Sequence, residues 1–241
     1  MDTHCTAIIL AGGRGRRMHT ETPKQFLSLA GKELFLYAVE TYARCPFVTD
    51  IVVVIPEEDK ERCEALLAPQ EKVRALSFSG EERFDSVYAG LSAIDWPCDV
   101  VLIHDGARPL TKEEDIETVY RTVLTDEAAV AAHPSKDTIK IVDDRQIVTD
   151  TLERSHLWNV QTPQGFSRTL IEKAYAELMA DRKNNAPIFV TDDASAVELY
   201  TEKKVKLVET SSWNLKVTTP EDLEQIGILL EYRKKTTEEN T

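Results

Sequence analysis

The sequence has few of the residues that build disulfide frameworks and metal centres. Its four cysteines are widely spaced, with no Cys-x-x-Cys pair and no histidine at metal-ligand spacing: Cys5, Cys45, Cys63 and Cys98. We therefore expect reduced, buried thiols. The five histidines form no metal set, and no serine or cysteine stands in a recognisable nucleophile motif. Covalent catalysis is therefore not indicated.

Long hydrophobic runs are also missing. The longest apolar runs have the length of a strand, far short of the roughly 20 residues that cross a bilayer, and the N-terminus has no signal-like hydrophobic region. We expect no membrane partner and a cytoplasmic location. Positive charge is scarce, since 29 Lys and Arg stand against 42 Asp and Glu and the formal net charge is −13. A nucleic-acid partner is excluded on this ground, because it needs a basic face.

The chain also lacks a linker. No Pro/Gly/Ser-rich stretch, internal repeat or low-complexity tract divides it, and 241 residues with 42% hydrophobic content can bury one sizeable core. We expect a single domain over residues 1–234 and a frayed polar tail over 235–241.

The first conspicuous feature is a glycine-rich loop after a short apolar run. Residues 6–10 are apolar and β-branched, which predicts a buried parallel strand, and Gly12, Gly13 and Gly15 follow. Glycine lets backbone N–H groups point at phosphate oxygens. Four cations are concentrated in the same loop of this acidic chain: Arg14, Arg16, Arg17 and Lys24. The loop therefore predicts an anionic small-molecule ligand that carries phosphates.

Two well-known phosphate loops do not fit this segment. The Gly-x-x-x-x-Gly-Lys-Ser/Thr pattern of kinases and ATPases is absent, and Met18 stands where a dinucleotide fingerprint has its third glycine. A kinase and a dehydrogenase are therefore both disfavoured.

Hydrophobic periodicity predicts alternating helices and strands. Helices are expected near 34–41, 57–68, 83–94, 112–125, 168–181, 192–200 and 220–234. Strands are expected near 51–55, 73–78, 100–104, 128–133, 138–142, 147–151, 205–209 and 214–217. Thr111-x-x-Glu114 reads as a capping box, and Thr219 before Pro220 as a second helix start. The alternation predicts an α/β, Rossmann-like three-layer sandwich with a mostly parallel, twisted sheet.

One region departs from this alternation. Residues 137–156 hold two short strands around a polar stretch, which predicts a projecting β-hairpin. Two strands alone are marginally stable, so we expect this arm to mediate dimerisation.

Polar residues follow several of the predicted strands, where ligands bind in open α/β sheets. Asp105 and Gly106 end one strand, and an aspartate there suits Mg²⁺ or a ribose hydroxyl, oriented by Arg108; the alternative is a structural Asp–Arg turn. Gly80 allows the backbone to approach a base and Ser86 is a hydrogen-bonding candidate, but such a segment taken alone is more often an ordinary capped helix start. A site rich in cations and poor in acid–base groups favours phosphoryl or nucleotidyl transfer.

Several motifs in a fixed order resemble the 2-C-methyl-D-erythritol 4-phosphate cytidylyltransferase family of the non-mevalonate isoprenoid pathway. The similarity extends over about residues 6–230 and rests on eight segments: 11–18, 23–25, 80–83, 104–109, 137–138, 161–164, 191–195 and 214–218. It implies a nucleotidyltransferase domain that forms a CDP-linked product and pyrophosphate from CTP and a sugar-alcohol phosphate, with Mg²⁺. The attacking phosphate oxygen is already anionic, so no general base is implied.

The resemblance also implies roles for individual residues. The implied catalytic cations are Arg17, Lys24 and Lys216. The implied CTP contacts are Ala11, Gly12, Gly13, Gly15, Gly80, Glu81, Ser86, Asp105 and Gly106, with Asp105 also the metal ligand. The implied sugar-phosphate contacts are Thr138, Arg154, Thr162 and Lys216. The arm would cross to a second subunit of a homodimer, so that Thr138 and Arg154 serve the partner's site.

Two alternatives stay open at this level. Ribitol-5-phosphate cytidylyltransferase shares the lysine loop, the Thr-Pro-Gln segment and the Lys-Val-Thr-Thr-Pro ending, whereas Gly106-Ala107, Trp158 and residues 191–195 favour the methylerythritol branch. A catalytically silent nucleotide-binding protein is the second alternative, which the intact basic residues disfavour.

Overall fold

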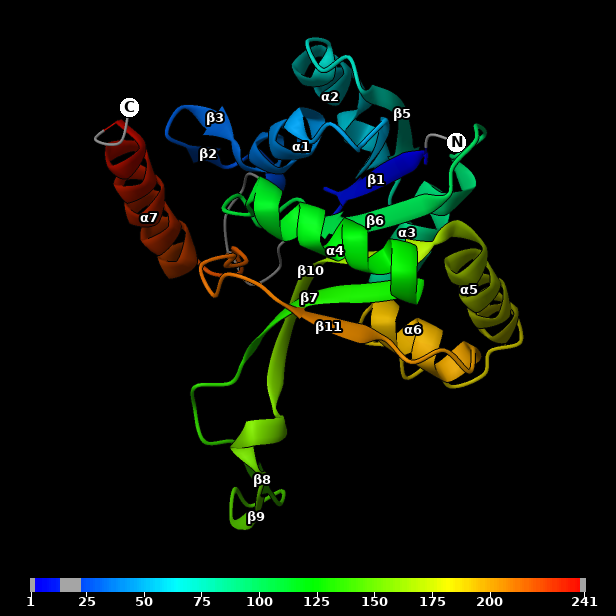
Figure 1. Cartoon of the computed structure of the whole chain (residues 1–241), viewed down its shortest axis with the longest axis vertical. Coiled ribbons are helices and arrows are strands. Elements are labelled where there is room, and N and C mark those ends of the chain that lie inside the picture. The colour runs from blue at the N-terminus through cyan, green and yellow to red at the C-terminus, as the bar shows by residue number, and fades with distance from the viewer. Residues whose placement is uncertain (1–2, 14–22, 239–241) are drawn as a thin grey trace.

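The core of the computed structural model, which describes residues 3–13 and 23–238, is a seven-stranded sheet (Figure 1). Its strands, in spatial order, are β11 (Lys206–Glu209), β7 (Ala128–Pro134), β10 (Trp158–Ser167), β6 (Val100–Asp105), β1 (Cys5–Leu10), β4 (Asp50–Ile55) and β5 (Val73–Phe78). Only β10 runs antiparallel to its neighbours. The predicted mostly parallel α/β sheet is confirmed.

Helices cover both faces of the sheet. One face packs against α1 (Leu34–Arg44), α2 (Lys60–Leu67) and α4 (Glu113–Asp126). The opposite face packs against α3 (Arg83–Ser92), α5 (Arg168–Lys183) and α6 (Asp193–Tyr200). In β1, Ala7 and Ile9 point into the first layer and Ile8 into the second, as the two-residue period of a strand requires. The three-layer prediction is therefore confirmed.

A third, smaller core lies beside the sheet. Helix α7 (Pro220–Glu238) contributes Ile226, which is buried with Leu29, Leu110 and Val217. Figure 1 shows α7 close to the short strands β2 (Ser28–Leu29) and β3 (Lys32–Glu33), and Leu34 at the start of α1 belongs to the same core. Three short helices also lie within the described residues: η2 (Lys24–Phe26), η3 (Glu57–Asp59) and η4 (Arg154–His156).

The start of α7 is capped as the sequence predicts. The carboxylate of Asp222 accepts a hydrogen bond from the backbone N–H of Thr219 at 2.8 Å, and the backbone N–H of Asp222 donates to Thr219 Oγ1 at 3.4 Å. This reciprocal pair satisfies N–H groups that a helix leaves unpaired at its first turn. The helix continues to Glu238, four residues beyond the predicted end.

The predicted hairpin is present as β8 (Lys140–Val142) and β9 (Val148–Thr151), which form a separate two-stranded sheet. It projects from the body of the molecule below β7 and β10 (Figure 1). Five large apolar side chains of this arm are between 40% and 59% exposed: Ile139, Ile141, Val142, Ile147 and Val148.

Three sequence-based expectations about elements are corrected. Strand β10 was not predicted, because Pro163 and Gly165 are unusual inside a central strand; a register shift between Val160 and Gln164 accommodates them. Residues 214–217 form no strand in the described structure. Helix α4 begins at Glu113 with Lys112 at its N-cap, so the capping box expected at Thr111 does not form.

The four cysteines are free, and three of them are fully buried, as expected. Within residues 3–13 and 23–238, no group of three or more His, Cys, Asp or Glu side chains is placed to hold a metal ion. No helix in the same part of the chain is long and apolar enough to cross a membrane. The cytoplasmic location stays a prediction.

Candidate functional site

The loops after β1, β5 and β6 meet at one edge of the sheet. The backbone N–H of Ala11 donates to the carbonyl of Val54 at 2.7 Å, and that of Gly106 donates to the carbonyl of Leu10 at 2.9 Å. A Cβ atom at Gly12 would lie 2.2 Å from Cβ of Ser79, so only glycine allows the two loops to approach this closely. The carboxyl ends of parallel strands are where open α/β sheets bind ligands.

Three cations surround the carboxylate of Asp105 at this edge. Its oxygens lie 2.9 Å from Nζ of Lys216, 3.5 Å from Nε of Arg108 and 3.6 Å from Nε of Arg83. Burial raises the pKa of Asp105, but Arg83, Lys216 and Arg108 lower it far more, so that the pKa lies well below its ordinary value. Asp105 is therefore ionised, and the cluster keeps an excess of positive charge.

Buried partners fix two of these cations. Arg83 makes a bidentate contact with Asp193, at 2.8 and 2.7 Å, and the hydroxyl of Tyr175 donates to the same carboxylate at 2.6 Å. The guanidinium of Arg108 donates to the backbone carbonyl of Asn214 at 2.7 Å. Paired, planar contacts of this kind hold arginine in one orientation.

The segment after β5 has the local structure of a helix start. The backbone N–H of Gly80 donates to Ser86 Oγ at 3.1 Å, and Ser86 Oγ donates to the carbonyl of Glu82 at 3.2 Å. A Cβ atom at Gly80 would lie 2.3 Å from Cβ of Asp85. The carboxylate of Glu81 extends to Arg182 at 3.0 Å. This segment is therefore an ordinary helix start. Gly80 also follows Ser79, which contacts the loop that contains Gly12, so both interpretations of the segment remain compatible with the structure.

The structure places Thr138 and Arg154 together on the arm, apart from the Asp105 cluster. Both line a concave surface of about 690 Å³, to which the carboxylate-bearing Glu153 and the ring of Trp158 also contribute. The guanidinium of Arg154 donates to the backbone carbonyl of Lys136 at 3.2 Å. None of the three cations around Asp105 lines this surface.

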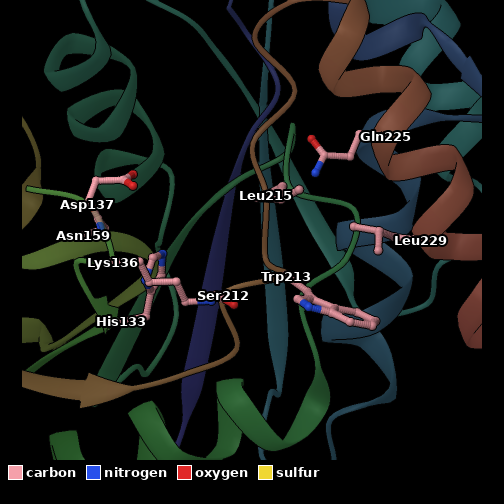
Figure 2. Close-up of a pocket in the computed structure, with 9 residues that line it drawn as sticks. All are labelled: His133, Lys136, Asp137, Asn159, Ser212, Trp213, Leu215, Gln225 and Leu229. Carbon is pink, nitrogen blue, oxygen red and sulfur yellow. The ribbon is translucent and has the colours of Figure 1, made fainter.

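A second pocket, of about 360 Å³, lies between the base of the arm and α7. Figure 2 shows one side of it formed by His133, Lys136, Asp137 and Asn159, and the other by Trp213, Leu215, Gln225 and Leu229. Leu215, which lines this pocket, directly precedes Lys216 of the Asp105 cluster in the sequence. Sequence reasoning missed this pocket because its walls come from three distant segments.

Some predicted residues fall outside the described structure. Gly15 and Arg17 do so, together with Arg14 and Arg16. Lys24 is the first residue of η2, and the description does not extend to its side chain. Gly13 is exposed directly after the loop contact at Gly12.

The site also contains residues to which the sequence analysis gave no role. They are His104, Asp193 and Asn214, all fully buried, with Tyr175 and Arg83. Four of the five lie within or beside motifs that the sequence analysis quoted, but a motif does not say which side chains meet. Thr162 lies among them with its side chain buried, 3.0 Å from His104.

Comparisons with known proteins agree over nearly the whole chain. The family model IspD, 2-C-methyl-D-erythritol 4-phosphate cytidylyltransferase, matches residues 5–231. A protein of that name from Lachnospira eligens is 43% identical over 227 residues, covering 93% of this chain and 98% of the relative. Another, from Geobacillus kaustophilus, is 42% identical over 219 residues, covering 90% of this chain and 92% of the relative.

Solved structures show the same similarity. The crystal structure of 4-diphosphocytidyl-2C-methyl-D-erythritol synthase from Anaerococcus prevotii aligns with a TM-score of 0.84 and 31% identity, covering 95% of this chain and 96% of that one. The 2-C-methyl-D-erythritol 4-phosphate cytidylyltransferase of Francisella tularensis aligns with a TM-score of 0.77 and 31% identity, covering 92% and 98%.

Proposed function

The chain belongs to the 2-C-methyl-D-erythritol 4-phosphate cytidylyltransferase family, and we propose that its reaction takes place around Asp105, at the carboxyl edge of the sheet. The enzyme transfers CMP from CTP to 2-C-methyl-D-erythritol 4-phosphate, in the non-mevalonate route to isoprenoid precursors. One observation carries this placement: three cations converge on Asp105 beside the loop that follows β1.

The chemistry explains why the site needs cations more than acid–base groups. A phosphate oxygen of the sugar-alcohol phosphate attacks the α-phosphorus of CTP, and the bond from that phosphorus to the pyrophosphate oxygen breaks. The attacking oxygen is already anionic, so no proton has to be removed. Negative charge accumulates on the α-phosphate and the leaving pyrophosphate, and Arg17, Lys24 and Lys216 would stabilise it.

We place CTP across the loops that meet after β1 and β5. The backbone of Ala11, Gly12, Gly13 and Gly15 would hold the triphosphate, and Gly80, Glu81, Ser86 and Gly106 would surround the cytidine. The close contact between Gly12 and Ser79 supports this arrangement, because it brings the two loops into one surface. Ser86 Oγ already bonds within its loop, so it would add a contact to an existing network.

The Asp105 carboxylate suits Mg²⁺ only in part. Mg²⁺ prefers oxygen ligands and is commonly held by one or two carboxylates together with substrate phosphates and water. Asp105 supplies one carboxylate, and the described residues offer no cluster of further metal ligands. We propose that Asp105 would hold the ion jointly with the triphosphate. The bound ion would neutralise phosphate charge.

We propose that the sugar phosphate is held by residues from two subunits of a homodimer. Lys216 and Thr162 lie near Asp105, whereas Thr138 and Arg154 lie on the arm. An arm that crossed to a partner would bring Thr138 and Arg154 to the partner's sheet edge. Its exposed apolar side chains support a contact of this kind, because burying them removes apolar surface from water.

The function is tested by measuring pyrophosphate release with CTP, ATP, GTP or UTP, each combined with methylerythritol phosphate or ribitol phosphate. We expect efficient turnover with CTP and methylerythritol phosphate alone. Turnover only with ribitol phosphate would assign the chain to the related ribitol-5-phosphate reaction. No turnover with any pair would favour a catalytically silent nucleotide-binding protein.

A further inference from the structure

Buried and partly buried hydrogen bonds connect three chain segments that meet behind Asp105. Thr162 Oγ1 lies 3.0 Å from His104 Nδ1, and the side-chain amide of Asn214 donates to the carbonyl of Thr162 at 2.7 Å. The carbonyl of Asn214 accepts from Arg108 at 2.7 Å, and the carbonyl of Arg108 lies 3.4 Å from His104 Nε2. The contacts therefore close into a ring of four residues.

The protons in this ring can be assigned from its acceptors. The carbonyl of Arg108 can only accept, so His104 Nε2 is the donor to it. Burial lowers the pKa of His104 to about 3, so its imidazole is neutral. Because Nε2 carries the proton, Nδ1 is an acceptor. Thr162 Oγ1 must then donate to Nδ1, while it accepts the backbone N–H of Asp105 at 3.2 Å. Each hydrogen bond has one possible direction.

The ring joins the segments that supply Asp105, Arg108 and Lys216, whereas Arg83 comes from the start of α3, outside the ring. His104 and Arg108 flank the end of β6, Thr162 belongs to β10, and Asn214 precedes Lys216 by two residues. One further backbone bond, from Val217 to the carbonyl of Ala107 at 2.8 Å, fastens the third segment to the first. Side chains of the ring are themselves buried, with His104 and Asn214 fully so and Thr162 3% exposed.

We propose that His104, Thr162 and Asn214 are positioning residues, which hold Asp105, Arg108 and Lys216 in the one arrangement that supports nucleotidyl transfer. The inference rests on the proposed location of the reaction. In this role none of the three has to touch substrate, because each acts through a backbone or side chain of the cluster; a direct contact of Thr162 with the sugar phosphate is the alternative that a double-mutant cycle tests. A displacement of about 1 Å in a catalytic site can cost about 10² in rate, and residues that orient metal ligands have comparable effects, of about 10 to 100-fold.

The first test compares two threonines in the same sheet. Thr162→Val keeps the shape of the side chain and removes the hydroxyl, and we expect kcat/KM to fall about 10 to 100-fold. Thr6→Val is the matched control, because Thr6 is also buried and its hydroxyl also makes a side-chain hydrogen bond, which it accepts from Trp96 at 3.0 Å. Thr6 stands in β1 at the end of the sheet away from Asp105. We expect near-normal kcat/KM for Thr6→Val. Thr162→Ser keeps the hydroxyl and should recover most of the kcat/KM that Thr162→Val loses.

A double-mutant cycle separates positioning from direct substrate contact. His104→Phe preserves packing against Tyr42, whose ring centroid is 5.0 Å from that of His104, and removes both nitrogens. If His104 and Thr162 act through the same hydrogen bonds, the double variant His104→Phe/Thr162→Val should have a kcat/KM no lower than that of the less active single variant. Losses that multiply would show that Thr162 contacts substrate independently, and would overturn the proposal.

Failure of the proposed positioning role can be distinguished from failure of the proposed catalytic site. Kinetics are measured on variants whose circular dichroism shows a folded protein at the assay temperature. If Lys216→Met retains wild-type turnover, the proposed site is wrong. If Lys216→Met loses turnover while Thr162→Val behaves like Thr6→Val, the site stands and the positioning role is refuted.

Discussion

Nζ of Lys216 lies 2.9 Å from a carboxylate oxygen of Asp105, a contact that joins the segment after β11 to the end of β6. The side chain of Lys216 is 33% exposed, so the contact with Asp105 leaves part of this side chain open to solvent. In this position the lysine can contact an incoming phosphate without leaving the cluster.

Replacing Lys216 should therefore reduce catalysis more than stability. We expect Lys216→Met to lower kcat/KM by at least about 10²-fold, as the loss of one donor to a developing negative charge does in other enzymes. Lys203→Met is the matched control, because Lys203 also pairs with a carboxylate, that of Glu127 at 2.6 Å, and its side chain is 32% exposed. Equal activity of the two variants in the pyrophosphate assay would remove Lys216 from the catalytic groups.

The contact between Gly12 and Ser79 can be tested by adding a methyl group at Gly12 and removing the side chain of Ser79. Gly12→Ala should destabilise the fold by about 1–3 kcal/mol, as overpacking does, and raise the KM for CTP. Adding Ser79→Gly removes the atoms that the new Cβ meets, so the double variant should recover CTP binding. Gly227→Ala is the control: its Cβ would have 3.7 Å to the nearest atom, and the helix should gain about 0.5–1 kcal/mol. Failure of Ser79→Gly to compensate would contradict the proposed shared surface.

The arm should determine the oligomeric state. We expect the wild-type chain to sediment as a dimer at micromolar concentration and Ile141→Asp to sediment as a monomer, because a charge would replace one of the apolar contacts of the arm. Ile228→Asp on α7 is the comparison, since Ile228 is 70% exposed but lies outside the arm. A monomeric wild-type protein would refute the arm-mediated dimer.

Subunit mixing can show whether the sites are shared. Lys24→Ala and Arg154→Ala dimers should each be impaired, the second mainly through a higher KM for the sugar phosphate. A mixed dimer has one site with both residues intact if Arg154 serves the partner, so mixing the two impaired proteins should restore turnover at a low concentration of the sugar phosphate. Absence of recovery, with heterodimers confirmed by mass, would place Arg154 in its own subunit's site.

The buried thiols should be inert at neutral and mildly alkaline pH. Burial raises the pKa of Cys45 to about 12 and that of Cys63 to about 11. Since the thiolate reacts with iodoacetamide, both residues should stay unmodified at pH 8 in the native protein and react once urea unfolds it. The pKa values are higher than in the unfolded chain, so the associated stability is complete below about pH 8.5 and is lost as pH rises toward these values. Equal modification rates in native and unfolded protein would contradict this burial.

Prediction of the fold from sequence succeeded where the local pattern was strong. Apolar runs such as residues 51–55 form strands because β-branched side chains suit a buried sheet, and helical periodicity located most of the helices. Strand β10 was missed because proline and glycine weaken the local signal, while pairing with β6 and β7 determines the strand. The 214–217 segment shows the reverse error: its local pattern suggests a strand, but its backbone bonds to the turn after β6.

The site shows the same division. The sequence by itself determined that a glycine- and arginine-rich loop follows the first strand, that an aspartate ends a later strand and that cations stand near the later strands, because these depend on residue type and order. Only the tertiary structure decided that Arg83, Arg108 and Lys216 converge on Asp105 and that His104, Thr162 and Asn214 close a ring behind it. Ionic and hydrogen-bonding contacts depend on distances of a few ångströms, and for residues far apart in sequence those distances are set by the packing of the whole sheet.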